Sequence, residues 1–190
     1  MEREINLRQK FRVGFWGKFI PLQGAPEIVA AAKLLAGEPD ICLVLIGNGQ
    51  TYQESVGLAA ELSLTNLEFT GFMPVQDLPA MINGFDVCLG IFGATPKTRR
   101  VIPNKIYEAL AMAKPVISAQ TPAIDELLAD GENILLCQTA SPEDLAAKIL
   151  MLKNDPVLSK KISQAGYQLY QEQCRPVVIA KKLLADLNLS

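Results

Sequence analysis

The sequence contains no histidine, and this removes the commonest general base and the commonest metal ligand among protein side chains. Its four cysteines, Cys42, Cys88, Cys137 and Cys174, are widely spaced and form no C-x-x-C pair. The first three lie in apolar, strand-like runs, so we expect buried and reduced thiols. Neither a D-x-D sequence nor a nucleophile elbow occurs, which disfavours a metal-dependent or serine-triad enzyme.

Long apolar runs and an excess of one charge are also absent. No stretch reaches about 18 consecutive apolar residues, and the N-terminal MEREINLRQKF is too charged for a signal peptide. The net charge is −2 and 20% of residues are charged, so the composition favours neither nucleic acid nor a membrane surface as a partner. We expect a soluble, cytoplasmic protein that binds no nucleic acid.

What is present is a regular alternation of strand and helix. A chain of 190 residues suits one domain, which would bury roughly 70% of its unfolded surface. We treat residues 1–10 as a linker remnant and 11–190 as one domain. Strands are predicted over 11–17, 41–47, 67–71, 86–92, 116–119 and 133–137. Helices are predicted over 25–36, 52–62, 78–84, 123–129, 142–153, 156–173 and 176–188, and one more begins at Pro103.

This alternation predicts a Rossmann-like, doubly wound α/β fold. Its six-stranded sheet is mainly parallel, with helices on both faces and extra helices at the C-terminus. The run ICLVLIG is apolar throughout, as in a central strand that is covered on both sides. Ligands of such sheets bind outside the carboxyl ends of the strands, which here carry the loops 17–24, 47–50, 71–74, 92–103 and 120–123.

The helix within IPNKIYEALAMAKPVIS is the central feature of the sequence. Pro103 suits its first position, because the missing N–H costs nothing there. An apolar stripe recurs at helical spacing along it: Ile106, Ala109, Leu110 and Ala113. Lys105 and Glu108 share a different face. Because the N-terminal end of a helix is positive, we expect a bound anion on its polar side.

Several loop motifs allow a structural or a functional interpretation. Gly47-Asn48-Gly49 is either a tight turn or part of a dinucleotide fingerprint, whose third glycine would fall at Tyr52. Gly17-Lys18 with Gln23-Gly24 is either an ordinary loop or a phosphate contact. No Walker sequence occurs, which disfavours a P-loop enzyme.

Basic residues gather just before and at the start of the central helix. Lys97, Arg99, Arg100 and Lys105 are four of the eighteen basic residues, within nine positions. Such a run is either a solvated face or an anion site. Its place at the end of a strand and before a helix N-terminus favours the anion site.

Taken together, these segments resemble the C-terminal, donor-nucleotide domain of family-four (group 1) retaining glycosyltransferases of the GT-B fold. GFWGKFIPLQG is similar to that family's strand and G-R-x-x-x-x-K-G loop, and LVLIGNGQ to its second strand and G-x-G turn. NLEFTGFMPVQDLPAMINGFDVCLGIF resembles the base-binding segment. KIYEALAMAKPVISA and AIDELLADGENILL resemble the signature E-A-M-A-x-G-x-P-V-V…E-x-x-x-x-G-x-x-G-x-L. The likeness covers about 11–153.

The resemblance implies roles for individual residues. Lys18 would contact the donor diphosphate with backbone N–H groups around Asn104 and Lys105, and Glu108 would bind the ribose hydroxyls. The remaining implied donor contacts are the loop residues Gly17, Gln23, Gly47 and Gly49 and the base-binding turn Phe72-Met73. Lys18 and Arg100 are the candidate catalytic residues, and no metal site is implied.

The sequence departs from the family pattern at three places. Arg100 stands where the family has the first glutamate of its E-x7-E motif, and Gln23 stands where it has a charged diphosphate contact. Pro122-Ala123 occupies the place of a frequent Gly-Gly near the sugar. These departures concern the sugar more than the nucleotide.

The resemblance implies transfer of a sugar from a nucleotide diphosphate, most simply UDP- or GDP-linked, to an acceptor hydroxyl, with no further cofactor. Its partner would be the N-terminal acceptor-binding domain of the same enzyme, which in many members supplies a histidine. Any membrane contact would come through that half.

Two alternatives to this function remain. A receiver-type module needs clustered aspartates after strands one and three, where this chain has Gly-Lys and Thr-Gly. A diverged domain kept for binding is the other.

Overall fold

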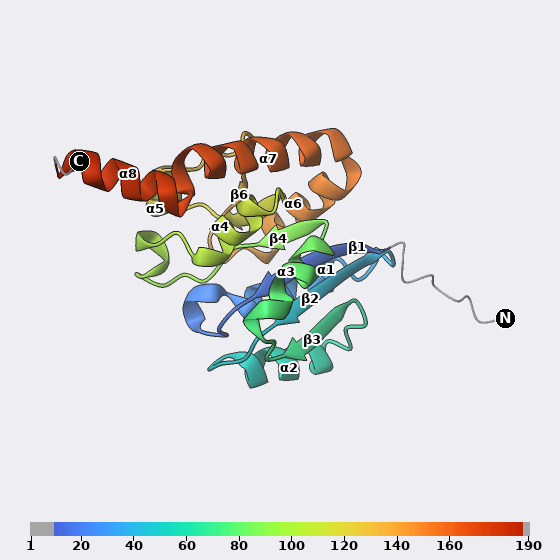
Figure 1. Cartoon of the computed structure of the whole chain (residues 1–190). Coiled ribbons are helices and arrows are strands. Elements are labelled where there is room, and N and C mark those ends of the chain that lie inside the picture. The colour runs from blue at the N-terminus through green and yellow to red at the C-terminus, as the bar shows by residue number, and fades with distance from the viewer. Residues whose placement is uncertain (1–9, 188–190) are drawn as a thin grey trace.

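The computed structural model describes residues 10–187, and residues 1–9, which were interpreted as part of a linker, lie outside this range. Strands and helices alternate along the chain (Figure 1). The strands are β1 (Phe11–Trp16), β2 (Ile41–Ile46), β3 (Leu67–Gly71), β4 (Val87–Leu89), β5 (Val116–Ala119) and β6 (Leu135–Cys137). The helices that follow strands are α1 (Ala25–Leu34), α2 (Tyr52–Glu61), α3 (Leu78–Asn83), α4 (Asn104–Ala111), α5 (Pro122–Asp125) and α6 (Pro142–Asn154). The chain continues through α7 (Pro156–Leu169), a π-helical turn (Tyr170–Cys174) and α8 (Pro176–Asp186).

All six strands belong to one parallel sheet in the order β3-β2-β1-β4-β5-β6. This confirms the predicted doubly wound fold. The strand order reverses between β1 and β4, which pair through Val13↔Val87 and Gly14↔Cys88. A crevice forms at such a reversal because the loops after the two strands leave toward opposite faces of the sheet.

The two faces of the sheet are buried by different helices. Val13 and Phe15 of β1 point to the face that α1 and α6 cover. Trp16 points to the opposite face, where it shares a cluster with α3, α4 and α5. Strand alternation therefore sends the last side chain of β1 toward α4. Figure 1 shows α8 extending away from the body of the domain.

The helix α4 begins and ends slightly inside its predicted limits. Pro103 is the N-cap, with φ −72° and ψ 147°, rather than the first helical residue. Ala113 has a left-handed φ of 52°, which ends the helix before Pro115 and leaves Ala113 exposed, so its predicted place on the apolar stripe is wrong. Ile106, Ala109 and Leu110 are fully buried as predicted.

Three other elements are shorter than predicted because side chains take over backbone hydrogen bonds. After β4, the Ile91 N–H donates to Ser118 Oγ at 3.2 Å, which interrupts the ladder. The Ala129 N–H donates to Asn133 Oδ1 at 2.9 Å, so α5 stops at Asp125. The Leu136 N–H donates to Asp130 Oδ1 at 2.7 Å, and β6 starts at Leu135.

The C-terminal helices follow the predicted limits closely. The Ser141 hydroxyl caps α6 by accepting from the Asp144 N–H at 3.2 Å, as its sequence predicted. The helix predicted over 156–173 becomes π-helical from Tyr170, where the Arg175 N–H donates to the Tyr170 carbonyl at 3.1 Å. Residue 188, the predicted end of the last helix, lies outside the described residues.

Candidate functional site

The loops after β1 and β4 are bonded to each other at the reversal of strand order. The Phe92 N–H donates to the Gln23 carbonyl at 3.2 Å, and the Gly93 N–H donates to the Leu22 carbonyl at 3.3 Å. A Cβ on Gly93 would lie 1.9 Å from the Pro21 carbonyl oxygen, so only glycine permits this approach. The two loops therefore form one continuous rim.

The turn after β2 is packed onto the same rim. The Phe19 N–H donates to the Asn48 carbonyl at 2.9 Å, and the Thr51 N–H donates to the Phe19 carbonyl at 3.0 Å. Gly47 has φ 128°, and a Cβ there would lie 1.9 Å from the Gly17 carbonyl oxygen. A Cβ on Gly49 would lie 2.5 Å from the Phe19 carbonyl oxygen. Close packing between loops therefore accounts for both glycines.

Lys105 is the most buried charged group of this region, at 5% exposure. Its Nζ donates to Gln23 Oε1 at 2.6 Å and lies 3.6 Å from the centre of the Phe15 ring. Burial lowers its pKa well below 10.5, and the nearby Glu108 carboxylate opposes that shift. The sequence groups Lys105 with Lys97, Arg99 and Arg100, whereas the structure buries its side chain against Gln23 and Phe15.

Glu108 stands one helical turn after Lys105 and is exposed. Its Oε2 accepts a 2.6 Å hydrogen bond from the indole Nε1–H of Trp16, which is only 3% exposed. The Trp16–Glu108 contact joins the end of β1 to α4 across 92 residues. Sequence reasoning did not single out Trp16, because nothing within one sequence pairs a strand residue with a helix that distant.

Two further predicted residues flank this pair in exposed positions. Lys18 is the second residue after β1 and is exposed, as is Asn104 at the first position of α4. No side chain caps the N-terminus of α4, so its first N–H groups are available to an anion.

The turn Phe72-Met73 lies farther along the same edge. It follows β3, which is two strands from β1 in the sheet order. Phe72 is 80% exposed, whereas Met73 packs against the core. The Gly47 N–H donates to the Gly71 carbonyl at 2.7 Å, which connects this turn to the rim through the turn after β2.

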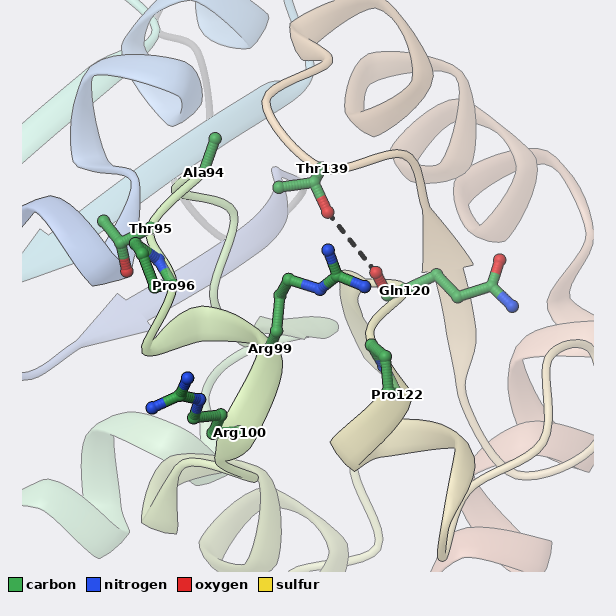
Figure 2. A pocket seen from close by; sticks show the side chains of 8 residues that line it. All are labelled: Ala94, Thr95, Pro96, Arg99, Arg100, Gln120, Pro122 and Thr139. Atoms are coloured by element: carbon green, nitrogen blue, oxygen red, sulfur yellow. Dashed lines mark hydrogen bonds between the residues drawn. The ribbon is translucent and has the colours of Figure 1, made fainter.

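Arg100 lies in a separate cavity at the carboxyl ends of β4 to β6. This cavity has a volume of about 830 Å³ and is lined by Ala94, Thr95, Pro96, Arg99, Arg100, Gln120, Pro122 and Thr139. Figure 2 shows Arg99 extending toward Thr139 and Gln120, whereas Arg100 extends away from them. The structure thus brings Gly17, Gln23, Lys105 and Glu108 together and places Arg100 on an adjacent wall.

Two observations concern the described residues as a whole. Within 10–187, no three His, Cys, Asp or Glu side chains are grouped so that they could hold a metal ion. Over the same range, no helix combines the length and the apolar character that a membrane crossing requires.

The strand order defines a doubly wound, Rossmann-like α/β protein, and the polar groups at its reversal form the candidate ligand site. A sequence model of the family "Glycosyl transferases group 1" matches residues 10–155. The chain belongs to the group 1 glycosyltransferases.

Two related curated sequences are about twice as long as this chain. A protein of Methanocaldococcus jannaschii, described as an uncharacterized glycosyltransferase, is 27% identical over 178 residues, which cover 92% of this chain and 48% of that protein. The 2-deoxystreptamine glucosyltransferase of Streptomyces kanamyceticus is 25% identical over 146 residues, 76% of this chain and 36% of its own. The chain thus spans about half the length of the first relative, and a smaller share of the second.

Solved structures share the fold. The C-terminal domain of the group 1 glycosyltransferase LpcC from Francisella tularensis superposes with a TM-score of 0.75 at 25% identity, covering 87% of each chain. HepE from Anabaena, solved in complex with UDP, gives a TM-score of 0.83 at 22% identity over 95% of this chain and 49% of its own. The chain therefore has the fold of the C-terminal domain of a GT-B-like group 1 glycosyltransferase.

Proposed function

We propose that this chain is the donor-binding half of a retaining, family-four glycosyltransferase, which moves a sugar from a nucleotide diphosphate to an acceptor hydroxyl. One observation carries the proposal. Two hydrogen bonds of 2.6 Å, Lys105–Gln23 and Trp16–Glu108, hold a cation and a carboxylate at the crevice between β1 and β4. The crystal structure of HepE with UDP, which shares the fold, supports a nucleotide diphosphate as the ligand class.

The chemical demand is to expel a diphosphate. The bond between the anomeric carbon and the diphosphate oxygen breaks, the carbon gains oxocarbenium character, and negative charge grows on the leaving group. Fixed positive groups that face this charge lower the barrier. We assign this role to Lys18, Lys105 and the uncapped N-terminus of α4, beginning at Asn104, and we propose that Arg100 contributes from the wall of the adjacent cavity. Because these groups supply the positive charge, we propose a metal-independent transfer.

Lys105 is suited to a ligand of this kind by its surroundings. Desolvation disfavours its charged form, and an adjacent phosphate would favour that form again. A bound diphosphate would therefore raise the pKa of Lys105. Gln23, which now accepts from Lys105 at 2.6 Å, would share the ammonium with the phosphate oxygens.

The nucleoside end is assigned to the other residues of the rim. Glu108 would accept hydrogen bonds from the ribose hydroxyls, with Trp16 fixing its orientation. Gly47 and Gly49 would allow the loops to pack closely beside the nucleotide, and Gly17 is assigned to the donor contacts at the start of the rim. The turn Phe72-Met73 would present its backbone groups to the base.

The acceptor site is assigned to an N-terminal domain of the same enzyme. The chain spans about half the length of its M. jannaschii relative, 48% of that protein. A reaction between two domains needs both, so the 190-residue chain is expected to bind nucleotide and to transfer no sugar. We propose UDP or GDP donors, and no cofactor beyond the donor.

Calorimetric titration of the chain with UDP and with GDP tests the proposal. Either nucleotide should bind with a millimolar or tighter Kd. Glu108→Ala should weaken binding about tenfold, because hydrogen bonds to charged groups are worth about 1.5–3 kcal/mol. Glu126→Ala, which removes an exposed carboxylate after α5, is the control and should leave the Kd unchanged. Failure of both nucleotides to bind at millimolar concentration contradicts the proposal.

A further inference from the structure

Arg99 is an unpaired cation that extends into a preformed cavity. It is exposed, and among residues 10–187 no carboxylate lies within salt-bridge distance of its guanidinium. Figure 2 shows the guanidinium extending toward Thr139 and Gln120, which line the same cavity of about 830 Å³. An arginine held in such a place has its hydrogen-bond donors free for a ligand.

The turn that carries Arg99 is tightly fixed. Thr98 is fully buried, and its hydroxyl lies 2.8 Å from the hydroxyl of Thr95. The Thr98 N–H also donates to the Thr95 carbonyl at 3.0 Å, and the Thr95 N–H donates to the Thr98 hydroxyl at 3.2 Å. These bonds close residues 95–98 into a compact turn, and the buried Thr98 anchors the short 3-10 helix Thr98–Arg100, so the backbone of Arg99 is preorganised.

The opposite wall is fixed as well. The Thr139 hydroxyl donates to the Gln120 carbonyl at 3.3 Å, and the Ala140 N–H donates to the Phe92 carbonyl at 2.9 Å. The loop after β6 is thereby attached to the end of β4. Both walls of the cavity are therefore fixed by hydrogen bonds near the carboxyl ends of the strands.

The lining of the cavity is entirely neutral or positive. It contains two arginines and no aspartate or glutamate, although the whole chain has a net charge of −2. The carboxylate of Asp125 accepts from the Gln120 amide at 3.4 Å, and Figure 2 shows that amide turned away from Arg99. The positive potential in the cavity is therefore a local feature, which favours an anion.

We propose that Arg99 binds an oxyanion, either carboxylate or phosphate, carried by the transferred sugar or by the acceptor, in the cavity that it lines together with Gln120 and Thr139. The planar guanidinium presents paired N–H donors that match both groups. The hydrogen bond from the Phe92 N–H to the Gln23 carbonyl connects the loop that lines this cavity to the rim that holds Lys105. That the oxyanion site lies beside a bound diphosphate therefore rests on the proposed function. The oxyanion site itself rests on the cavity alone.

Titration of the chain with matched anionic and neutral probes tests this inference. The donor arm compares UDP-glucuronate with UDP-glucose, and the acceptor arm compares glycerol 3-phosphate with glycerol, with and without UDP. In at least one arm the anionic probe should bind about tenfold more tightly than its neutral match, an advantage that falls as salt rises. The arm that shows the advantage identifies the source of the oxyanion.

The variants Arg99→Gln and Arg175→Gln separate this site from general charge. Both remove one exposed positive charge, but Arg175 lies before α8, outside the lining of the cavity. Arg99→Gln should abolish the advantage and leave the Kd of UDP alone within about twofold, whereas Arg175→Gln should change neither. Equal binding of anionic and neutral probes in both arms overturns the inference, and so does an advantage that survives in Arg99→Gln. Loss of UDP binding alone would instead count against the proposed function, because the phosphate arm without UDP does not depend on it.

Discussion

At the scale of single residues, the site depends on two hydrogen-bonded pairs of polar groups, each of which has one buried member. An ammonium at 5% exposure is costly unless its lost hydration is replaced, and Lys105 replaces it with the Gln23 amide and the face of Phe15. Trp16 likewise buries its ring while its N–H reaches the exposed Glu108. Each pair joins β1 or its loop to α4, so the geometry of the crevice depends on a few side chains.

The burial of Lys105 gives a prediction about pH. Its pKa is lowered in the folded chain, so between that lowered value and 10.5 the unfolded chain binds a proton that the folded chain does not. The contribution of Lys105 to the free energy of unfolding therefore rises with pH between the lowered pKa and 10.5. Urea unfolding at about pH 7 to 10 should show that the free energy of unfolding rises more with pH in the wild type than in Lys105→Met. Lys160→Met, which removes an exposed lysine of α7, controls for net charge; a difference that does not vary with pH refutes the prediction.

The hydrogen bond from Trp16 gives a prediction about affinity. Trp16→Phe keeps an aromatic ring but removes the N–H that orients Glu108, so the Kd of the bound nucleotide should rise about three- to tenfold. Because Phe also leaves space in the core, the test is a double-mutant cycle with Glu108→Ala. In the Glu108→Ala background, Trp16→Phe should leave the Kd unchanged. Equal losses in both backgrounds would show that Trp16 acts through packing alone.

At the scale of elements, the strands and helices were predictable where one periodicity dominates. The apolar run of β2 and the stripe of Ile106, Ala109 and Leu110 led to correct elements because burial alone specifies them. Element ends were less predictable. Ser118 interrupts the ladder after β4, and Ala113 takes a left-handed φ of 52° to end α4. Such ends depend on side chains from other parts of the chain, or on a backbone strain that no local pattern records.

The sequence predicts at which edge of the sheet the loops meet, but not which of their residues are in contact. The order of elements places the loops after β1 and β4 at one edge, but the sequence does not pair Gln23 with Lys105 or Trp16 with Glu108. Those pairs require the register of β1 and the rotation of α4 about its axis. The roles of these residues toward a nucleotide remain predictions.

The glycine turn after β2 gives a prediction at this scale. Gly47→Ala would place a Cβ 1.9 Å from the Gly17 carbonyl oxygen at φ 128°, so the rim must shift. We expect a loss of about 1–3 kcal/mol in the free energy of unfolding and weaker nucleotide binding. Gly57→Ala is the matched control, because Gly57 lies in α2 with open space around its Cβ position. This control should stabilise the chain by about 0.5–1 kcal/mol. Equal thermal melting temperatures for the two variants would contradict the packing argument.

At the scale of the whole molecule, ligand binding is tied to the stability of the sheet. No single segment of the sequence predicts the strand order. The alternation of strands and helices with right-handed crossovers allows few orders, and the observed β3-β2-β1-β4-β5-β6 is one of them. The proposed nucleotide site lies where β1 and β4 pair, so it needs that pairing to be intact. A ligand bound there therefore stabilises the entire sheet against unfolding.

The four free cysteines can report this coupling. Cys88, Cys137 and Cys174 are buried, and burial raises the pKa of both Cys88 and Cys137 to about 12, so their thiolates are scarce in the folded chain. Cys42, predicted to be buried, is only half-buried and lies near the amino end of β2. Mass spectrometry of alkylated chains should therefore show Cys42 reacting first and Cys88 and Cys137 reacting only through unfolding.

Nucleotide should change these labelling rates unequally. If UDP binds only the folded chain, a concentration of about 100 times its Kd should slow the labelling of Cys88 and Cys137 about 100-fold. The rate at Cys42 should stay the same, because its thiol is reached without unfolding the sheet and lies at the opposite edge from the rim. Cys42→Ser separates the two classes of signal. Equal slowing at all four thiols, Cys42 included, would mean that UDP acts on the reagent rather than on unfolding, whereas slowing at Cys88 and Cys137 without slowing at Cys42 ties the ligand to the stability of the folded sheet.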